Sequence, residues 1–134
     1  MSTFGLHLTI DGYEGNETLM NNLELCREVL DELPAKIGMQ KMTAPYVIRD
    51  PDVRKPGVTG FVVIEFSHIS LHTFIKDRYI AFDCFSCTPF DTTMVKEYIM
   101  KTFKLKSAKV NIIGRGMTPQ SAVEVVESRQ KVRA

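Results

Sequence analysis

Three consecutive segments in the middle of the chain constrain its fold more than any others. Residues 59–66 are almost wholly apolar and rich in β-branched side chains, which predicts a strand buried on both faces or at its centre. Residues 68–75 and 78–86 have the composition of two further strands, and residues 76–78, Lys-Asp-Arg, predict the turn between them. Strands joined by such short turns pair antiparallel. The sequence therefore predicts an antiparallel meander of three strands.

The segment before this meander predicts a strand followed by a helix. Residues 4–13 alternate apolar and polar side chains, as a strand with one buried face does. Residues 17–33 carry apolar side chains three or four positions apart, which is the spacing of one helix face. Asn16 is suited to the N-cap of this helix, and Pro34 together with Gly38 predicts its end.

The remaining segments complete the predicted order of elements. Residues 39–48 are expected to form a strand, and the proline-containing stretch after it is expected to be a loop. Asp91 is expected to cap a second helix, residues 107–113 to form a last strand, and the polar tail 118–134 to form a loose helix. This order predicts an α+β fold, a two-layer α/β sandwich with a mostly antiparallel sheet and two main helices. One sheet face is then left without cover, so we expect two copies to form a homodimer or a larger assembly.

Composition excludes several classes of partner. The 134 residues are 44% hydrophobic and 25% charged, as expected for a single globular domain spanning residues 1–134. The net charge of +1 argues against a nucleic-acid partner, which needs a basic surface. No apolar stretch approaches the ~18 residues of a membrane span, and the N-terminus lacks the pattern of a signal peptide. We therefore expect a cytoplasmic protein whose three cysteines are reduced.

Histidine and cysteine pairs raise the question of a metal or redox site. His68 and His72 have the i, i+4 spacing of a zinc pair, but that spacing brings two imidazoles together only on a helix. On the predicted strand they lie about 13 Å apart, at ~3.3 Å per residue. Cys84 and Cys87 form a CxxC pattern, yet positions i and i+3 of a strand point to opposite faces. Cys26 falls on the apolar helix stripe, so we expect neither a metal site nor a redox site.

A longer motif runs through residues 57–87. Its characteristic members are Ser67, His68, His72, Thr73, Tyr79, Ala81, Asp83, Phe85 and Cys87. Together with Gly5-Leu-His-Leu8 and Arg115-Gly116, this block resembles the pyruvoyl-dependent S-adenosylmethionine decarboxylase proenzymes of bacteria and archaea. The resemblance is close over residues 57–87 and looser over most of the chain.

The resemblance implies that the chain cleaves itself between Phe66 and Ser67. In this family the serine hydroxyl attacks the preceding carbonyl, and elimination of the resulting ester leaves a pyruvoyl group, which is the cofactor. The products would be a β chain, residues 1–66, and an α chain, residues 67–134. The pyruvoyl group takes up the electrons released when S-adenosylmethionine loses carbon dioxide. The product of that reaction is the aminopropyl donor for spermidine biosynthesis.

The resemblance also assigns roles to five further positions. Thr59 stands where the family has a serine whose hydroxyl stabilises the oxyanion, and His72 stands at the position of the base. Cys87 is implied to be the proton donor in decarboxylation. Phe74, where the family commonly has tryptophan, would stack on adenine, and Glu65 is the other residue assigned to substrate binding. We expect this site near the interface of a homodimer, because so short a chain has little room to enclose a nucleoside.

Three departures from the family pattern concern the substrate. The usual glutamate before the processed serine is replaced by Phe66, and Glu65 one step earlier points to the other face if it lies on a strand. The usual Pro-Glu after the stacking aromatic is Ile75-Lys76 here. These changes motivate two alternatives. One is a pyruvoyl-dependent decarboxylase of arginine or ornithine, and the other is an unprocessed homologue with a regulatory role.

Overall fold

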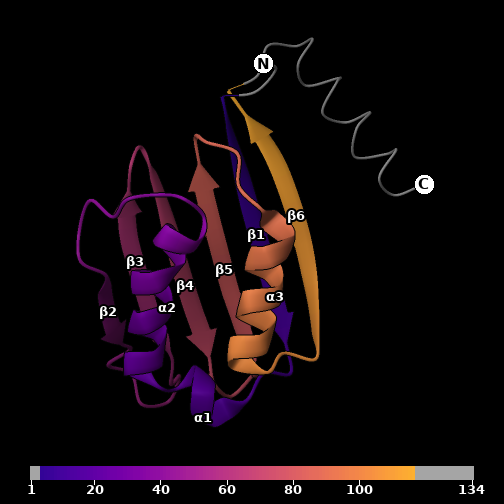
Figure 1. The fold of residues 1–134 in the computed structure, drawn as a ribbon. Helices are drawn as coiled ribbons and strands as arrows, with labels where there is room; N and C mark the ends of the chain where they lie inside the picture. Colours follow the sequence, from indigo (N-terminus) through magenta and orange to yellow (C-terminus); the bar gives the residue numbers. More distant parts are fainter. Residues whose placement is uncertain (1–3, 117–134) are drawn as a thin grey trace.

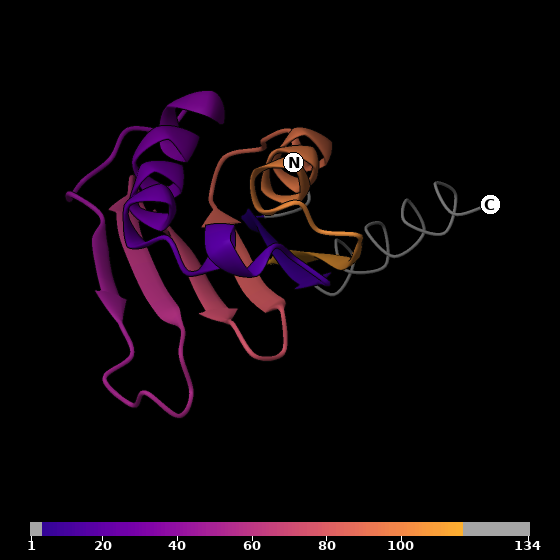
Figure 2. The same ribbon diagram turned by 90° about the horizontal axis from the view of Figure 1, so that it is seen from below.

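Residues 4–116 are described in the computed structural model and form two layers, a sheet with helices packed on one face (Figure 1). Seen from below, the helices lie on the same side of the sheet and leave its other side uncovered by this part of the chain (Figure 2). The strand order is β2-β3-β4-β5-β1-β6, with every neighbouring pair antiparallel. In chain order the elements are β1 (Gly5–Tyr13), α1 (Glu17–Met20), α2 (Leu23–Lys36), β2 (Tyr46–Arg49), β3 (Val58–Ile64), β4 (Ser67–Phe74), β5 (Tyr79–Ser86), α3 (Thr92–Phe103) and β6 (Ser107–Arg115).

The predicted α+β sandwich with two main helices is confirmed, and β3, β4 and β5 form the expected meander. Of the two alternatives predicted for the first of these strands, burial on both faces or burial at its centre, burial on both faces is wrong. Along β3 the residues alternate between buried and exposed, and Phe61 retains 42% of its side-chain exposure. The reason is that the helices cover only one face, so the apolar side chains on the other face of β3 have no layer against them.

The segment predicted as one helix over 17–33 is two helices. Asn16 caps α1 as expected, and its side chain accepts a hydrogen bond from the Leu19 amide. A second asparagine, Asn22, caps α2 in the same way and restarts the chain in a new direction. Helix α2 continues past Pro34 by two residues and ends where Gly38 adopts a φ of +78°, a conformation that favours glycine.

The expected strand over 39–48 is also wrong in extent, because β2 begins only at Tyr46. Pro45 directly before it has no N–H for a sheet hydrogen bond, so the ladder cannot continue through that position. Asp91 caps α3 as predicted, by accepting a hydrogen bond from the Met94 amide. The last strand runs two residues beyond the predicted end, to Arg115. The predicted helix over 118–134 lies outside the described residues.

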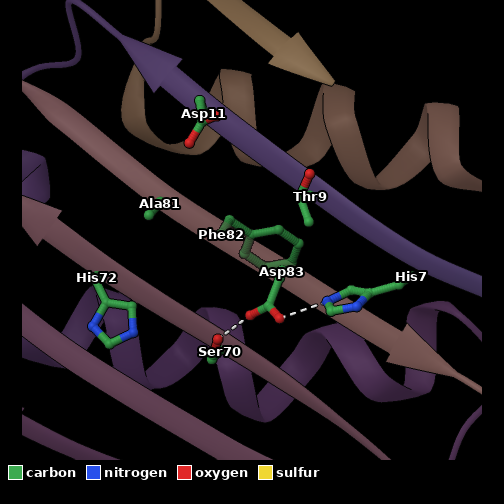
Figure 3. A pocket seen from close by; sticks show the side chains of 8 residues that line it. All are labelled: His7, Thr9, Asp11, Ser70, His72, Ala81, Phe82 and Asp83. Atoms are coloured by element: carbon green, nitrogen blue, oxygen red, sulfur yellow. Dashed lines mark hydrogen bonds and ion pairs between the residues drawn. The ribbon is translucent and has the colours of Figure 1, made fainter. Parts of the chain in front are cut away.

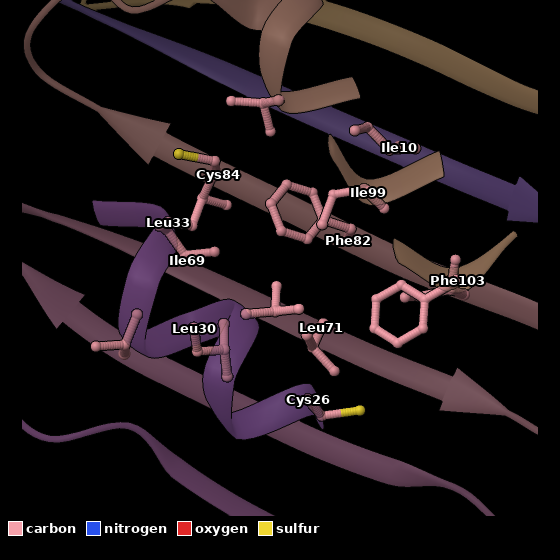
Figure 4. Packing of buried hydrophobic residues seen from close by; sticks show 14 of the residues in the cluster. Ile10, Cys26, Leu30, Leu33, Ile69, Leu71, Phe82, Cys84, Ile99 and Phe103 are labelled. Atoms are coloured by element: carbon pink, nitrogen blue, oxygen red, sulfur yellow. The ribbon is translucent and has the colours of Figure 1, made fainter. Parts of the chain in front are cut away.

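The core lies between the helix layer and the sheet (Figure 4). Its fully buried members include Leu30 and Leu33 from α2, Ile99 and Phe103 from α3, and apolar residues from the sheet strands between them. Helix α2 packs directly on β3 at Gly60, where an added Cβ would lie 2.5 Å from Leu30 Cδ1. A side chain at position 60 would therefore force the Leu30 side chain to shift. No helix between residues 4 and 116 is long and apolar enough to cross a membrane.

Substituting Leu30 by alanine tests this packing. We expect Leu30→Ala to lower the free energy of unfolding by about 2–5 kcal/mol, because the lost side chain leaves a cavity beneath α2. Leu23→Ala is the matched control on the same helix, since Leu30 is 0% exposed and Leu23 is 36% exposed. Its cost should stay below about 1 kcal/mol. Urea unfolding followed by circular dichroism measures both, and equal losses would contradict the described packing of α2.

Candidate active site

The residues predicted to carry chemistry fall into two groups at opposite ends of the β3–β4 hairpin. One group, here called the turn group, consists of Glu65, Phe66, Ser67 and Cys87. The other, here called the far group, consists of Thr59, His72 and Phe74. Because β3 and β4 pair antiparallel, with Ile64 opposite Ser67 and Thr59 opposite His72, each group gathers residues from different parts of the sequence.

Hydrogen bonds hold the turn group together. The Ser67 hydroxyl accepts a hydrogen bond of 3.1 Å from the Cys87 amide, and only 8% of the serine is exposed. The Cys87 thiol lies 3.9 Å from the carbonyl oxygen of Glu65, to which it donates. These contacts arise because the start of β4 lies beside the end of β5, in the register that pairs His68 with Phe85. A serine hydroxyl, a thiol and the turn backbone are therefore adjacent.

The backbone at Phe66 is strained. Glu65 and Phe66 form the two-residue turn between β3 and β4, and Phe66 adopts a φ of +53°. Such a conformation costs a bulky L-residue roughly 1–2 kcal/mol, because its Cβ approaches the following carbonyl. The ring itself is 89% exposed, so burial in the described chain does not compensate this cost. The strain lies in the residue whose carbonyl forms the peptide bond to Ser67.

The far group lies on the uncovered face of the sheet. The Thr59 hydroxyl and the Nδ1 atom of His72 share a hydrogen bond of 3.1 Å across the two strands. Phe74 projects from the same face and stacks on Tyr79, with 5.4 Å between the ring centroids. Both Thr59 and His72 are exposed.

One copy of the chain does not bring the two groups together. Ser67 and His72 are separated by five positions on β4, which is about 16 Å at ~3.3 Å per residue. An odd separation also places their side chains on opposite faces of the sheet. The buried side chain of Ser67 points toward the helices, whereas His72 faces away from them.

A pocket of about 420 Å³ opens on the uncovered face near the far group (Figure 3). Its polar lining includes His7, Asp11, Ser70, His72 and Asp83. The Asp83 carboxylate pairs with His7 Nε2 at 2.7 Å and accepts a hydrogen bond from the Ser70 hydroxyl. His7, Asp11 and Ser70 were not among the residues predicted for a site. The alternation along β1 could have identified His7 and Asp11, because it places both on the face opposite Leu8 and Ile10.

Raised pKa values limit which tyrosine and cysteine side chains react. Burial, followed by the hydrogen bond to Asp11, raises the pKa of the Tyr79 hydroxyl to about 12. Burial likewise raises the pKa of both the Cys26 and Cys84 thiols to about 12. These three groups stay protonated at neutral pH, and the two thiols are poor nucleophiles. Cys87 differs from them in position, because it is half-buried at the end of a strand.

A second pocket, of about 180 Å³, lies beside Phe74. Three cationic side chains contribute to its wall, those of Arg54, Lys55 and Lys76, together with the carboxylate of Asp77. Lys76 is one of the departures from the family pattern, and it brings a positive charge to this pocket.

Comparisons with known proteins agree with the motif. The family model for S-adenosylmethionine decarboxylase matches residues 6–116. The S-adenosylmethionine decarboxylase proenzyme of Thermococcus onnurineus is 30% identical over 118 residues, covering 87% of this chain and 81% of that protein. The proenzyme of Persephonella marina is 31% identical, with 87% and 86% covered. The crystal structure of the adenosylmethionine decarboxylase from Aquifex aeolicus has the same fold, with a TM-score of 0.76 at 23% identity over 90% of this chain and 97% of that one. The chain therefore belongs to the S-adenosylmethionine decarboxylase family, a family of carboxy-lyases, as its motif predicts.

Proposed function

We propose that this chain is a proenzyme that cleaves itself between Phe66 and Ser67 and then decarboxylates S-adenosylmethionine. One observation carries the proposal. In a chain of this family, a buried and hydrogen-bonded serine directly follows a strained residue, and Cys87 contacts both the serine and the turn. We further propose that the enzyme acts in the cytoplasm and supplies the aminopropyl donor for spermidine synthesis.

Self-cleavage begins at the turn group. The Ser67 hydroxyl attacks the carbonyl carbon of Phe66, and its proton passes to the departing amide nitrogen, so that an ester replaces the peptide bond. The amide of Cys87, at 3.1 Å, orients the hydroxyl oxygen for this attack. Rupture of the amide also frees the backbone of Phe66 from its positive φ, so part of the strain is released in this step.

A base then removes the α-proton of Ser67, and the carboxylate of Phe66 leaves. The dehydroalanine that remains tautomerises and takes up water, with loss of ammonia, to give the pyruvoyl group. We assign the base to His72 in the tautomer whose Nδ1–H donates to the Thr59 hydroxyl, because its Nε2 can then accept a proton. The Thr59 hydroxyl, in the same pair, is assigned to the oxyanion of the first step.

These two residues must come from a second copy of the chain. Within one copy His72 lies about 16 Å from Ser67 and on the other sheet face, beyond the reach of any proton transfer. A two-fold dimer that places uncovered face against uncovered face would bring the far group of each copy to the β3–β4 turn of the other, where the exposed Phe66 lies at the end of the hairpin. The same arrangement covers exposed apolar side chains such as Phe61 and Val63.

The residues around Ser67 suit a pyruvoyl group at that position. When present, this group provides a ketone that binds the substrate amine and takes up the electrons of the broken carbon–carbon bond. Cys87 Sγ is assigned to deliver the proton to the carbon that lost carbon dioxide, because this thiol lies beside the start of β4. Phe74 of the second copy is assigned to stack on adenine, and Glu65 of the turn to bind the substrate.

A second candidate function is decarboxylation of arginine or ornithine. The pocket beside Phe74 has three cationic side chains, Arg54, Lys55 and Lys76, and Lys76 stands where the family pattern has an acid. Phe66 and Ile75 are two other departures from the family pattern, and Ile75 lines the same pocket. A decarboxylase for a smaller amino acid would keep the same processing residues.

Intact-mass measurement tests the self-cleavage. The purified protein should give two masses, for residues 1–66 and for residues 67–134 with a blocked N-terminus. Ser67→Ala should remain one chain, because it has no hydroxyl to form the ester. A single mass of 15.2 kDa from long-incubated wild-type protein would instead favour an unprocessed regulatory homologue. Release of labelled carbon dioxide from S-adenosylmethionine, arginine and ornithine, assayed in parallel, then decides the substrate.

Mixed dimers test whether the site is shared between copies. Ser67→Ala and His72→Ala chains, each uncleaved alone, should restore cleavage of the His72→Ala chain when co-expressed, because its Ser67 then meets an intact histidine from the partner. The matched control is the doubly substituted chain, Ser67→Ala with His72→Ala, co-expressed with His72→Ala, where no histidine is available at position 72. Failure of the mixed dimer to cleave, with dimer formation verified by two affinity tags, would contradict the shared site.

Replacing Phe66 tests the role of strain. In the uncleavable Ser67→Ala chain, Phe66→Gly should raise the free energy of unfolding by up to about 1 kcal/mol, since glycine accepts a positive φ. Glu65→Gly, in the same turn but without a positive φ, should lower it by about 0.5 kcal/mol. With Ser67 present, Phe66→Gly should slow self-cleavage by up to about tenfold, the equivalent of ~1.4 kcal/mol. If Phe66→Gly left the rate of self-cleavage unchanged and lowered the free energy of unfolding, strain at Phe66 would have no role in the reaction.

A further inference from the structure

We propose that His7, His68 and Asp83 bind one divalent transition-metal ion, such as Zn²⁺ or Co²⁺, on the uncovered face of the sheet. The sequence predicted no metal site, because the i, i+4 spacing relates His68 only to His72. The histidine that complements it lies 61 positions earlier in the chain, on β1. None of these three side chains has a part in the self-cleavage or decarboxylation described above.

Strand order brings the three residues together. His7 on β1 and His68 on β4 are both paired with Phe85 of β5, from its two sides. Asp83 lies two positions before Phe85 and therefore points to the same face. Its Oδ2 atom is 2.7 Å from His7 Nε2 and 3.7 Å from His68 Nε2. One ligand atom from each residue lies within 4.8 Å of the other two.

These distances suit a tetrahedral ion after small side-chain rotations. Bonds of ~2.0–2.2 Å to imidazole nitrogen and carboxylate oxygen keep neighbouring ligand atoms roughly 3.4 Å apart. The distance of 3.7 Å between His68 Nε2 and Asp83 Oδ2 is already close to that value. The distance of 2.7 Å between His7 Nε2 and Asp83 Oδ2 has to lengthen when the ion binds. Two imidazoles and one carboxylate are a donor set typical of zinc, iron or cobalt, with the fourth position left for water.

The surroundings hold the three side chains in place, as the outer shell of a metal site does. The Ser70 hydroxyl donates to Oδ1 of Asp83, which leaves Oδ2 directed at His7 (Figure 3). The His68 ring stacks on Phe61 at 5.3 Å, and the His7 ring meets the edge of Phe85 at 5.9 Å. Within residues 4–116, Asp83 makes ion pairs with these two histidines and with neither lysine nor arginine. Its charge is thus free to be matched by a cation.

Cobalt titration of the chelator-treated protein tests the proposal. We expect one Co²⁺ per chain, with visible d–d absorption and no thiolate charge-transfer band, since no cysteine belongs to the cluster. His7→Gln, His68→Gln and Asp83→Asn should each weaken binding at least tenfold. His72→Gln is the matched control when all variants are made in the uncleavable Ser67→Ala chain, so that every protein compared is unprocessed. It removes the only other histidine of the chain and no member of the cluster, so its affinity should equal that of the Ser67→Ala chain.

A second measurement needs no substituted protein. With three histidines in the whole chain, the imidazole NMR signals can each be followed while Zn²⁺ is added to the wild-type protein. The signals of His7 and His68 should shift together, and the signal of His72 should keep its position. Absence of Co²⁺ binding at millimolar concentration would overturn the proposal. So would binding that survives His7→Gln, or a shift that involves His72 instead of His7. These readouts do not depend on self-cleavage, so their failure leaves the proposed function untouched.

Discussion

One-sided burial of an antiparallel sheet is the constraint on which the rest of this structure depends. Successive residues of a strand point to opposite faces. Each strand therefore has one set of residues that faces the core and a second set that faces the uncovered side of the sheet. On β1 and β4, Leu8 and Ile69 contribute to the core, whereas His7 and His68 occupy the other face. A shift of one residue in any ladder would exchange the two sets, so the packing of α2 and α3 also fixes where the polar side chains gather.

The same constraint divides the residues of the family motif. Ser67 is buried on the helix side of β4, and His72 projects from the opposite side of the same strand. A single layer of sheet therefore separates a nucleophile from its assigned base. The proposed assembly with a second copy would supply the missing residues and cover apolar side chains in one event. Processing would then depend on association as well as on folding.

Local signals made part of the fold predictable. Asp91 and Asn16 act as N-caps because their short polar side chains reach amides within three residues, which can be read from the sequence. The division of the first helix could not be read so easily, since the apolar spacing continues across the break at Asn22. Burial of β3 was misjudged for a related reason. Phe61 is apolar but exposed, and composition alone does not reveal that its layer is missing. In the site, the separation of five positions between Ser67 and His72 already implied that their side chains lie apart on a strand. The contact of His7 with Asp83 depends instead on strand order, which no local pattern encodes.

The two-residue turn at Phe66 has a consequence for the permanence of the proposed cut. A break there would leave β3 and β4 as the ends of separate polypeptides, held together by the β3–β4 ladder, by the ladders of β1 with β5 and β6, and by the shared core. The new carboxylate would sit on an aromatic residue that has no packing partner in the described chain, so this end would fray into solvent. Fraying removes the proximity that religation requires. Cleavage at this turn would thus be irreversible, because the two new chain ends separate while the sheet stays intact.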